Sequence, residues 1–362
     1  MSTISAVLFV FCASFISLFV FRKLAKRVGL VDKPNERKHH IGQVPLIGGI
    51  SIYCTLMITL FAFFPITRSL LLYVACSSIL IVLGALDDRF DLSFKTRLVV
   101  QAVISLAMIL LGYKSLHYLG AMFTHEAFTI PTYLSYLVTI FAVIGAINAF
   151  NMVDGIDGLL GGLASVTFSA LGLMFYLSGK INLAIFCMLF VCAMLPYIML
   201  NLGFPFGRQF KVFMGDAGSM FIGFTAIWLL IEASQSENML VIRPVTALWF
   251  IALPLMDMVC IMTRRIRKGQ SPFKPDREHL HHICQRIGLS SAQSLFVICL
   301  LASIMAGGGV LSELYNVSES FMFLSFLLTF AVYFIVIANI WRITAFLNKY
   351  FRVTFPSHNG HI

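Results

Sequence analysis

One short segment of the chain carries four amide or carboxylate side chains at three-residue intervals. Asn148, Asn151, Asp154 and Asp157 occur in the stretch NAFNMVDGIDG, at the end of an apolar run. Carboxylate and amide oxygens are suitable ligands for a hard cation, and the free N–H groups at a helix start bind phosphate. We therefore expect a helix end, a tight turn and a new helix whose start cradles a phosphate. A capped turn without a ligand is the alternative.

The three-residue spacing also limits which of these side chains act together. On a continuous helix such steps drift by about 60° each, so only neighbours in the series share a face. Asn151 and Asp154 are expected to point into one site, while Asp157 serves another part of the ligand.

Two further motifs place carboxylates at the ends of apolar runs. Asp87 and Asp88 are adjacent in ALDDRFDLS, and adjacent side chains point in different directions on a helix. We expect one carboxylate to face a site and the other a partner, unless both only end a solvated helix. In KVFMGDAGSMFIG, Asp216 either holds a ligand or only caps the helix that follows. Phe213 offers an aromatic face for a base.

A polar segment near the C-terminal third holds three histidines, in RRIRKGQSPFKPDREHLHHICQR (264–286). His279, His281 and His282 lack a nearby cysteine or further histidine that would complete a tetrahedral zinc site. We expect them, with Arg277, to contact an anionic sugar nucleotide by hydrogen bonds.

The composition is that of an integral membrane protein, because 59% of the residues are hydrophobic and only 12% are charged, against about 25% charged in soluble domains. Apolar runs of about 17–25 residues can cross a bilayer as helices. We find eleven: 4–21, 46–64, 69–86, 97–113, 130–149, 159–177, 181–200, 217–234, 244–263, 291–311 and 320–341. The fold class expected is therefore an all-α membrane protein with a single polytopic domain, residues 1–362. Asp257, inside the ninth run, is either functional or paired with a neighbouring helix.

Basic residues set the expected orientation. Of the 26 Lys and Arg, all but Arg68, Lys114, Lys180 and Arg243 fall in one set of loops or in the C-terminal tail. Basic residues stay on the cytoplasmic side, so we expect a periplasmic N-terminus, a cytoplasmic C-terminus and a site at the cytoplasmic face. The net charge of +10 then reflects topology and attraction to lipid surfaces, with no need for nucleic acid. The expected cytoplasmic loops are 22–45, 87–97, 150–158, 201–216 and 264–290.

Four of these motifs, in this order and with this topology, resemble the polyprenyl-phosphate N-acetylhexosamine-1-phosphate transferase family. The motifs are the pair Asp87-Asp88, the series 148–157, FMGDAGS with Asp216, and HLHH. The resemblance covers nearly the whole chain. DKPNERKHH, NAFNMVDGIDGLLGGL and SPFKPDREHLHH look like the bacterial branch that acts on undecaprenyl phosphate and UDP-GlcNAc. Leu280 interrupts the run of three histidines that is usual in the muramyl-pentapeptide branch.

The resemblance implies a reaction and its participants. Undecaprenyl phosphate would displace UMP from UDP-GlcNAc, in the bacterial inner membrane, giving a lipid-linked sugar that primes O-antigen or enterobacterial common antigen. Membrane lipids are further expected partners, and a homodimer stays open. The family uses Mg²⁺ or Mn²⁺, which Asp216 and Asn151 would bind.

Roles for the remaining residues follow from the same motif matching. Phe213 would stack on uracil, and Asp157 with Gly155 would hold the uridine. Arg265 and the His segment would meet the diphosphate and sugar. Further expected substrate-binding residues are Asn148 and Arg97, and the expected catalytic residues are Asp87, Asp88 and Asp154. Because a phosphate monoester is largely dianionic at neutral pH, we expect direct displacement, with Asp88 positioning a group or removing a proton.

Two other classes of function stay open from the residues alone. An intramembrane prenyltransferase also uses Asn/Asp-rich helices with Mg²⁺, but its two Asp-rich motifs are more widely spaced. A transporter would place ionisable groups near the bilayer midplane, whereas here only Asp257 is such a candidate.

Overall fold

The computed structural model describes residues 3–32, 42–123, 126–235, 240–272 and 279–340, together with 342 and 344. The expected contact of Arg277 lies outside these residues. The described chain is almost entirely helical. Its helices are α1 (Thr3–Val28), α2 (Gly48–Phe63), α3 (Arg68–Phe90), α4 (Phe94–Gly112), α5 (Thr132–Met152), α6 (Leu159–Leu177), α7 (Ile181–Asn201), α8 (Gly215–Ser234), α9 (Pro244–Phe250), α10 (Ala252–Arg267), α11 (Leu280–Arg286), α12 (Ser291–Leu314) and α13 (Glu319–Ala338).

Short strands and a 3₁₀ turn join some of these helices. Within the described residues, two antiparallel strand pairs form, β1 (Val31–Asp32) with β2 (Val44–Pro45) and β3 (Tyr118–Gly120) with β4 (Phe128–Thr129). A 3₁₀ turn covers Arg208–Phe210. The first pair matters for the site, because Phe213 donates its backbone N–H to Pro45 O at 2.9 Å and accepts from Gly48 N, also at 2.9 Å.

Every apolar run expected to span the membrane falls on a helix. Within the described residues, nine helices are long and apolar enough to cross a bilayer on their own. The ninth expected run is broken: α9 and α10 meet at an angle of 78°, so together they form a bent span or a re-entrant element. The second expected run gives α2, which has only 16 residues. At 1.5 Å per residue it is shorter than the usual hydrocarbon core of about 30 Å.

Several helices continue into the segments that were expected to be loops. The helix α3 continues through Asp87 and Asp88 to Phe90, so the expected loop 87–97 shrinks to three residues before α4 begins. Asp91 ends α3 in the left-handed conformation, with φ 51°, and its N–H bonds to Asp87 O at 2.8 Å. Likewise α1 runs on to Val28 and α10 to Arg267. Polar residues that end an apolar run can stay helical, because a helix satisfies its own backbone wherever the side chains point.

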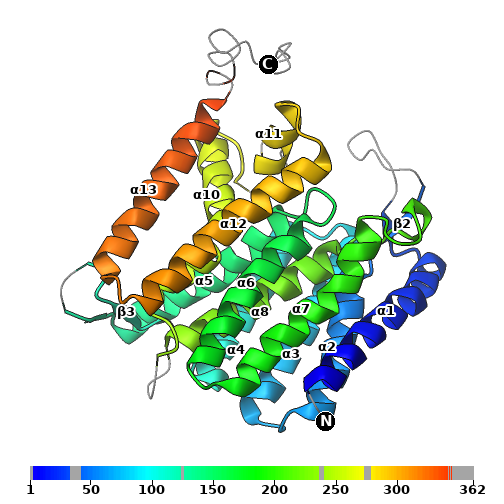
Figure 1. The fold of residues 1–362 in the computed structure, drawn as a ribbon, viewed down its shortest axis with the longest axis horizontal. Coiled ribbons are helices and arrows are strands. Elements are labelled where there is room, and N and C mark those ends of the chain that lie inside the picture. Colours follow the sequence, from blue (N-terminus) through cyan, green and yellow to red (C-terminus); the bar gives the residue numbers. More distant parts are fainter. Residues whose placement is uncertain are drawn as a thin grey trace.

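The helix α8 lies at the centre of the bundle (Figure 1) and is buried along almost its whole length. Close approach depends on small residues: a Cβ on Gly49 would overlap Gly218, and one on Gly84 would overlap Ala217. Small residues let membrane helices pack closely. Since Asp88 lies one turn beyond Gly84 on α3, this crossing brings Asp88 to the first turn of α8.

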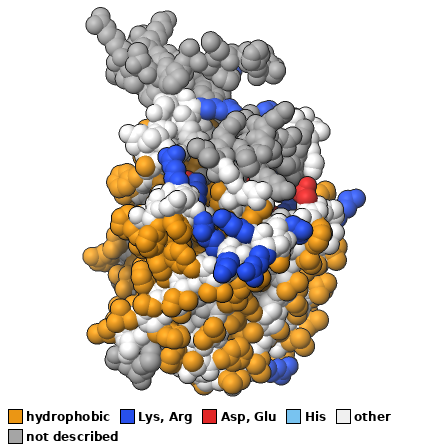
Figure 2. All heavy atoms as spheres, turned by 90° about the vertical axis from the view of Figure 1, so that its right-hand side faces the viewer, with side chains coloured by type: hydrophobic (Ala, Val, Ile, Leu, Met, Phe, Trp, Pro, Cys, Tyr) orange, Lys and Arg blue, Asp and Glu red, His pale blue; other side chains and the backbone are white. Residues whose placement is uncertain are grey.

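The molecule has a distinct polar end. In Figure 1, α1 begins at the lower end, and α11, β2 and the end of α13 lie at the upper end. Figure 2 shows a broad hydrophobic surface below a row of Lys and Arg side chains. This is the pattern of a protein held at a lipid–water boundary.

Candidate active site

A cavity of about 490 Å³ opens at this polar end, between the first turn of α8, the α5–α6 turn and α11. The described residues that line it are Asp32, Leu46, Asp88, Asn151, Asp154, Gly155, Ile156, Asp157, Asn201, Lys211, Phe213, Gly215, Asp216, Gln285 and Ser291. Seven of the residues named as site candidates are among them: Asp88, Asn151, Asp154, Gly155, Asp157, Phe213 and Asp216. Segments that lie far apart in the sequence therefore meet at this cavity.

Asp88 holds the start of α8. Its Oδ1 accepts the backbone N–H of Asp216 at 2.8 Å, and its Oδ2 accepts that of Ala217 at 3.3 Å. These are two of the N–H groups that a helix start leaves without internal partners. Gly215 has φ +76°, and a Cβ there would lie 2.5 Å from Asp88 Oδ2. The glycine before Asp216 is thus required both by the left-handed backbone and by the Asp88 carboxylate.

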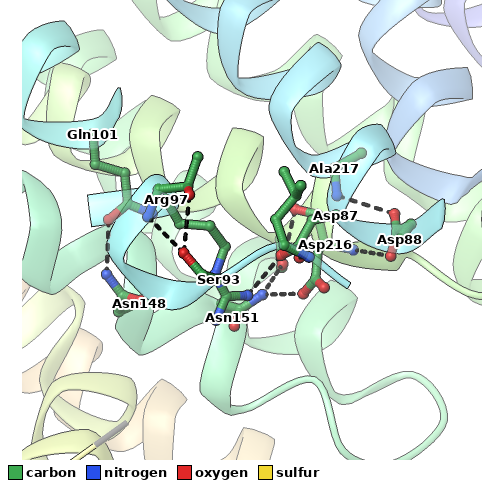
Figure 3. A network of polar contacts seen from close by, with 12 residues as sticks. Asp87, Asp88, Ser93, Arg97, Gln101, Asn148, Asn151, Asp216 and Ala217 are labelled. Atoms are coloured by element: carbon green, nitrogen blue, oxygen red, sulfur yellow. Dashed lines mark hydrogen bonds and ion pairs between the residues drawn. The ribbon is translucent and has the colours of Figure 1, made fainter. Parts of the chain in front are cut away.

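Asp216 and Asn151 lie side by side in the cavity wall and are in direct contact (Figure 3). The Asn151 amide nitrogen donates to Asp216 Oδ1 at 2.5 Å and to Ser219 Oγ at 2.8 Å. The two residues named for the metal are therefore in direct contact. A half-turn of the Asn151 amide about χ2 presents its oxygen towards Asp216 instead, which would give two adjacent oxygen ligands.

The turn 153–158 between α5 and α6 carries Asp154 and Asp157, as the sequence predicted. Among the N–H groups at the start of α6 that were expected to cradle a phosphate, that of Gly158 donates to Asn201 Oδ1 at 2.6 Å, so it is not free for this role. Asn201 also donates from its Nδ2 to Val212 O at 2.8 Å and is 2% exposed. It therefore ties the turn to the segment that precedes Phe213.

Asp157 pairs with a lysine that the motifs did not single out. The Lys211 Nζ lies 2.6 Å from Asp157 Oδ2 and 5.0 Å from the centre of the Phe213 ring. A cation over an aromatic face is attracted to it. The three side chains form one wall of the cavity with a positive, a negative and an aromatic group side by side.

Asp87, Arg97 and Asn148 lie outside the cavity lining. Asp87 Oδ2 accepts from Arg97 Nη1 at 2.7 Å, and its Oδ1 accepts from Leu92 N at 2.8 Å. The Asn148 amide donates to Gln101 Oε1 at 2.9 Å (Figure 3). The expectation that Asp87 and Asp88 serve different purposes agrees with this arrangement, since Asp88 faces the cavity and Asp87 joins α3 to α4.

The His segment packs behind the cavity. His281 is 2% exposed, its Nε2 has no hydrogen-bond partner among the described residues, and a Cβ on Gly155 would overlap its ring. Burial first, and then the neighbouring His282 and His279, lower the pKa of His281 to about 3, so this ring is neutral. His282 packs on His281 with ring centres 4.2 Å apart. Arg265, 3% exposed, donates from Nη1 to Pro272 O at 2.5 Å.

The cavity is strongly acidic. Five of its described lining residues are Asp, and Lys211 is the one basic side chain among them. Asp154 lines the cavity and is exposed there, although many protein atoms surround its carboxyl group. Desolvation by these atoms first, then the charge of Asp216 and then that of Asp157, raise its pKa to about 7. Because ionised carboxylates repel one another, these acids do not all ionise readily unless a cation offsets part of their charge.

A divalent cation fits this set of donors. Among the described residues no three His, Cys, Asp or Glu side chains converge as a complete metal cage. Mg²⁺ does not need one, because it is usually held by one or two carboxylates with waters and substrate phosphates. Asp216 and Asn151 are placed to supply the protein's share.

Comparison with known proteins gives the family. Residues 70–234 match Glycosyl transferase family 4. The undecaprenyl-phosphate alpha-N-acetylglucosaminyl 1-phosphate transferase of Escherichia coli (strain K12) is 49% identical over 92% of this chain and 91% of its own length. Proteins of the same name from Yersinia pestis and Haemophilus influenzae are 49% and 45% identical, over 97% and 94% of this chain and 95% of their own lengths.

The chain belongs to this glycosyl transferase family. The resemblance drawn from the four motifs is thereby confirmed. The matched residues 70–234 include Asp87, Asp88, the series 148–157 and Asp216, so the family segment contains most of the acidic cavity.

Of the cavity-lining residues that sequence reasoning missed, three differ in how far the sequence could have indicated them. Asn201 is a polar residue at the end of an otherwise apolar helix, which is a usable signal. Lys211 lies two residues before Phe213 but looked like one more cytoplasmic basic residue. Gln285 enters the cavity wall only because α11 folds back over the α5–α6 turn, and no local pattern in the sequence indicates that.

Proposed function

We propose that this chain transfers GlcNAc-1-phosphate from UDP-GlcNAc to undecaprenyl phosphate and releases UMP. The observation that carries the proposal is the acidic cavity where Asp88, Asn151 and Asp216 meet. It occurs in a chain 49% identical, over 92–97% of its length, to transferases with that printed name. The product would be the lipid-linked primer for O-antigen or enterobacterial common antigen.

The proposed topology places this cavity at the cytoplasmic face of the bacterial inner membrane. Eleven membrane-crossing elements, with α2 and the bent pair α9–α10 each counted once, give a periplasmic N-terminus and a cytoplasmic C-terminus. The segregation of basic residues supports this orientation. A site at that face meets both substrates, because UDP-GlcNAc is soluble and the phosphate of undecaprenyl phosphate stays at the interface while its tail stays in lipid.

The reaction brings phosphate groups into a cavity that is already acidic. A bound Mg²⁺, or Mn²⁺, would offset the charge of the phosphates and of the leaving UMP. Asp216 and Asn151 would hold the ion. Asp88 keeps Asp216 in place through the first turn of α8, and Asp154 adds a carboxylate that ionises near neutral pH.

The bond changes need no covalent enzyme intermediate. An oxygen of undecaprenyl phosphate attacks the phosphorus that bears GlcNAc, the bond from that phosphorus to the bridging oxygen breaks, and UMP leaves with that oxygen. Since the attacking phosphate is largely dianionic at neutral pH, no residue has to take a proton from it. Asp88 accepts two backbone N–H groups, so it acts by positioning α8.

The wall formed by Phe213, Lys211 and Asp157 fits the uridine diphosphate part of the donor. An aromatic face can stack on uracil, a carboxylate accepts from N–H and O–H groups, and a lysine binds phosphate as a point charge. When the donor enters, Lys211 would exchange its bond to Asp157 for a phosphate oxygen.

A panel of substrates tests the proposal against the other two classes. Purified protein with undecaprenyl phosphate and Mg²⁺ is expected to release UMP from UDP-GlcNAc, and to incorporate labelled UMP into UDP-GlcNAc, because the step exchanges one diphosphate for another. UDP-GalNAc and UDP-glucose serve as controls for the sugar. Reaction with prenyl diphosphate but not with UDP-GlcNAc favours a prenyltransferase. Flux into proteoliposomes without UMP release favours a transporter.

A further inference from the structure

Asp257 lies within the bundle on α10, a little more than one turn beyond the bend that separates α9 from α10. It is 3% exposed, and its carboxylate has three partners from two other helices and their flanks. The Oδ2 lies 2.9 Å from His279 Nδ1, while the Oδ1 accepts from Leu280 N at 3.1 Å and from the Tyr333 hydroxyl at 2.8 Å.

These contacts decide between the two interpretations of this intramembrane acid. With three donors, the carboxylate is occupied within the protein, so it is a fixed acceptor and not a group waiting for a ligand. Its partner His279 is one of the histidines that the sequence predicted to meet the substrate, and in the structure it lies behind the cavity lining. Because a carboxylate only accepts, the His279 Nδ1 carries the proton in this pair when the ring is neutral, and Nε2 is then an acceptor.

The same cluster is coupled to the cavity through α11. The His279 ring stacks on His281 with ring centres 5.6 Å apart, and His281 fills the space above Gly155 in the α5–α6 turn. One turn further along α11, Gln285 lines the cavity itself. A shift at the start of α11 is therefore transmitted both to the turn that carries Asp154 and to the cavity wall.

We propose that Asp257 is a positioning residue for the transfer reaction, holding His279 in one ring orientation and tautomer and fixing α11 against the α5–α6 turn. This inference rests on the proposed function. Carboxylates that orient a functional histidine in this way act through its second ring nitrogen. Asp257 itself lies outside the cavity lining in the part of the chain that the structure describes.

The substitution Asp257→Asn separates positioning from packing. The amide oxygen can keep the bonds from Leu280 N and Tyr333, so α11 stays anchored. The amide nitrogen would face His279 Nδ1, and because it donates, the neutral ring must take the opposite tautomer. Asp257→Ala, by contrast, removes all three bonds and leaves the donors buried without a partner, which destabilises the fold.

The experiment measures UMP release, the KM for UDP-GlcNAc and thermal unfolding of the full-length protein in detergent. For Asp257→Asn we expect kcat to fall about 10–100-fold, with KM and melting temperature close to wild type. Met262→Leu, on the same helix, is the matched control and should behave as wild type. An Asp257→Asn variant with wild-type kcat overturns the inference. A wild-type protein that releases no UMP overturns the proposed function, and the inference with it.

A double variant keeps the test decisive if Asp257→Asn also lowers the melting temperature. When two residues act as a unit, their effects are not additive. If Asp257 acts through His279, adding Asp257→Asn to His279→Ala lowers kcat little further, after rates are normalised to folded protein. If the two decreases in kcat multiply fully in the double variant, Asp257 acts without His279 and the inference is contradicted.

Tyr333→Phe removes one hydroxyl donor to Asp257. It should lower kcat much less than Asp257→Asn does.

Discussion

The carboxylate of Asp88 caps the helix that carries Asp216: its Oδ1 lies 2.8 Å from the Asp216 backbone nitrogen, and its Oδ2 lies 3.3 Å from that of Ala217. One acid therefore sets the position of the other. Asp87, its neighbour in sequence, points instead to Arg97 at 2.7 Å. This division explains why an adjacent pair of acids is useful at the end of α3.

The two acids should respond differently to the same change. Asp88→Asn replaces one accepting oxygen by a donating nitrogen against the start of α8, so we expect UMP release to fall about 10²-fold. Asp87→Asn weakens the ion pair with Arg97 and should lower the free energy of unfolding by about 1.5–3 kcal/mol, with a smaller loss of kcat. Assays of kcat and of thermal unfolding on both variants check this. Equal loss of kcat in the two variants contradicts the division.

Lys211 should affect binding of the donor more than turnover. Lys211→Met removes the partner of Asp157 and the cation beside Phe213. Losing one charge-assisted bond of about 1.5 kcal/mol raises KM for UDP-GlcNAc roughly tenfold, with a smaller change in kcat. Lys95→Met, an exposed lysine on α4, is the control and should leave both constants unchanged. An unchanged KM in Lys211→Met would remove Lys211 from the proposed donor site.

Gly155 should be intolerant of a side chain because of one neighbour. A Cβ there would overlap the buried ring of His281, and the turn with Asp154 or α11 must then move. Misplacement of about 1 Å can cost up to about 10²-fold in rate, so Gly155→Ala should lose most of its UMP release. Gly307→Ala on α12 is the control, since a Cβ there meets nothing within 4 Å. Full activity of Gly155→Ala would show that the contact with His281 is unimportant.

Metal binding should depend on pH through Asp154. The pKa of Asp154, about 7, lies above the ordinary value near 4, so the neutral carboxyl group favours the folded state. This contribution to the free energy of unfolding is fully present below about pH 4 and is lost as the pH rises through about 7. A cation that binds the ionised carboxylates of the cavity restores the free energy of unfolding that is lost at higher pH. We therefore expect Mg²⁺ to raise the melting temperature more at pH 8 than at pH 5, and to release protons on binding.

Two measurements check this pH dependence. Thermal unfolding with Mg²⁺ and with EDTA gives the gain in melting temperature at each pH, and calorimetry in buffers of different ionisation enthalpy gives the protons released. Asp154→Asn should weaken both effects. The same gain at pH 5 and pH 8 in the wild-type protein would contradict the account of Asp154.

Much of the site could be predicted because short polar residues are conspicuous in an apolar chain. Asn151, Asp154, Asp157 and Asp216 needed only the observation that several helix ends carry hard oxygen ligands. The end of α5, the turn and the start of α6 followed from the same segment. The 78° break between α9 and α10 was not predicted, because the run 244–263 is apolar on both sides of Ile251.

Contacts between distant segments explain what the sequence could not indicate. The roles of Asp87 and Asp88 depend on the crossing of α3 and α8, which close approach at Gly84 and Ala217 determines. The start of α6 was expected to offer free N–H groups to a phosphate, but Asn201, 43 residues further on, accepts the N–H of Gly158. The partners of Asp257 come from α11 and α13, so its role could only be left open.

The decisive measurement is UMP release from UDP-GlcNAc with undecaprenyl phosphate, comparing wild-type protein, Asp216→Asn and Asp91→Asn. Asp91 ends α3 at the same polar end but lies outside the cavity lining, and asparagine suits its left-handed backbone. We expect Mg²⁺-dependent release by wild type and Asp91→Asn, and about 10²-fold less release from Asp216→Asn. Wild-type turnover by Asp216→Asn, or release that persists after complete chelation of divalent cations, would contradict it.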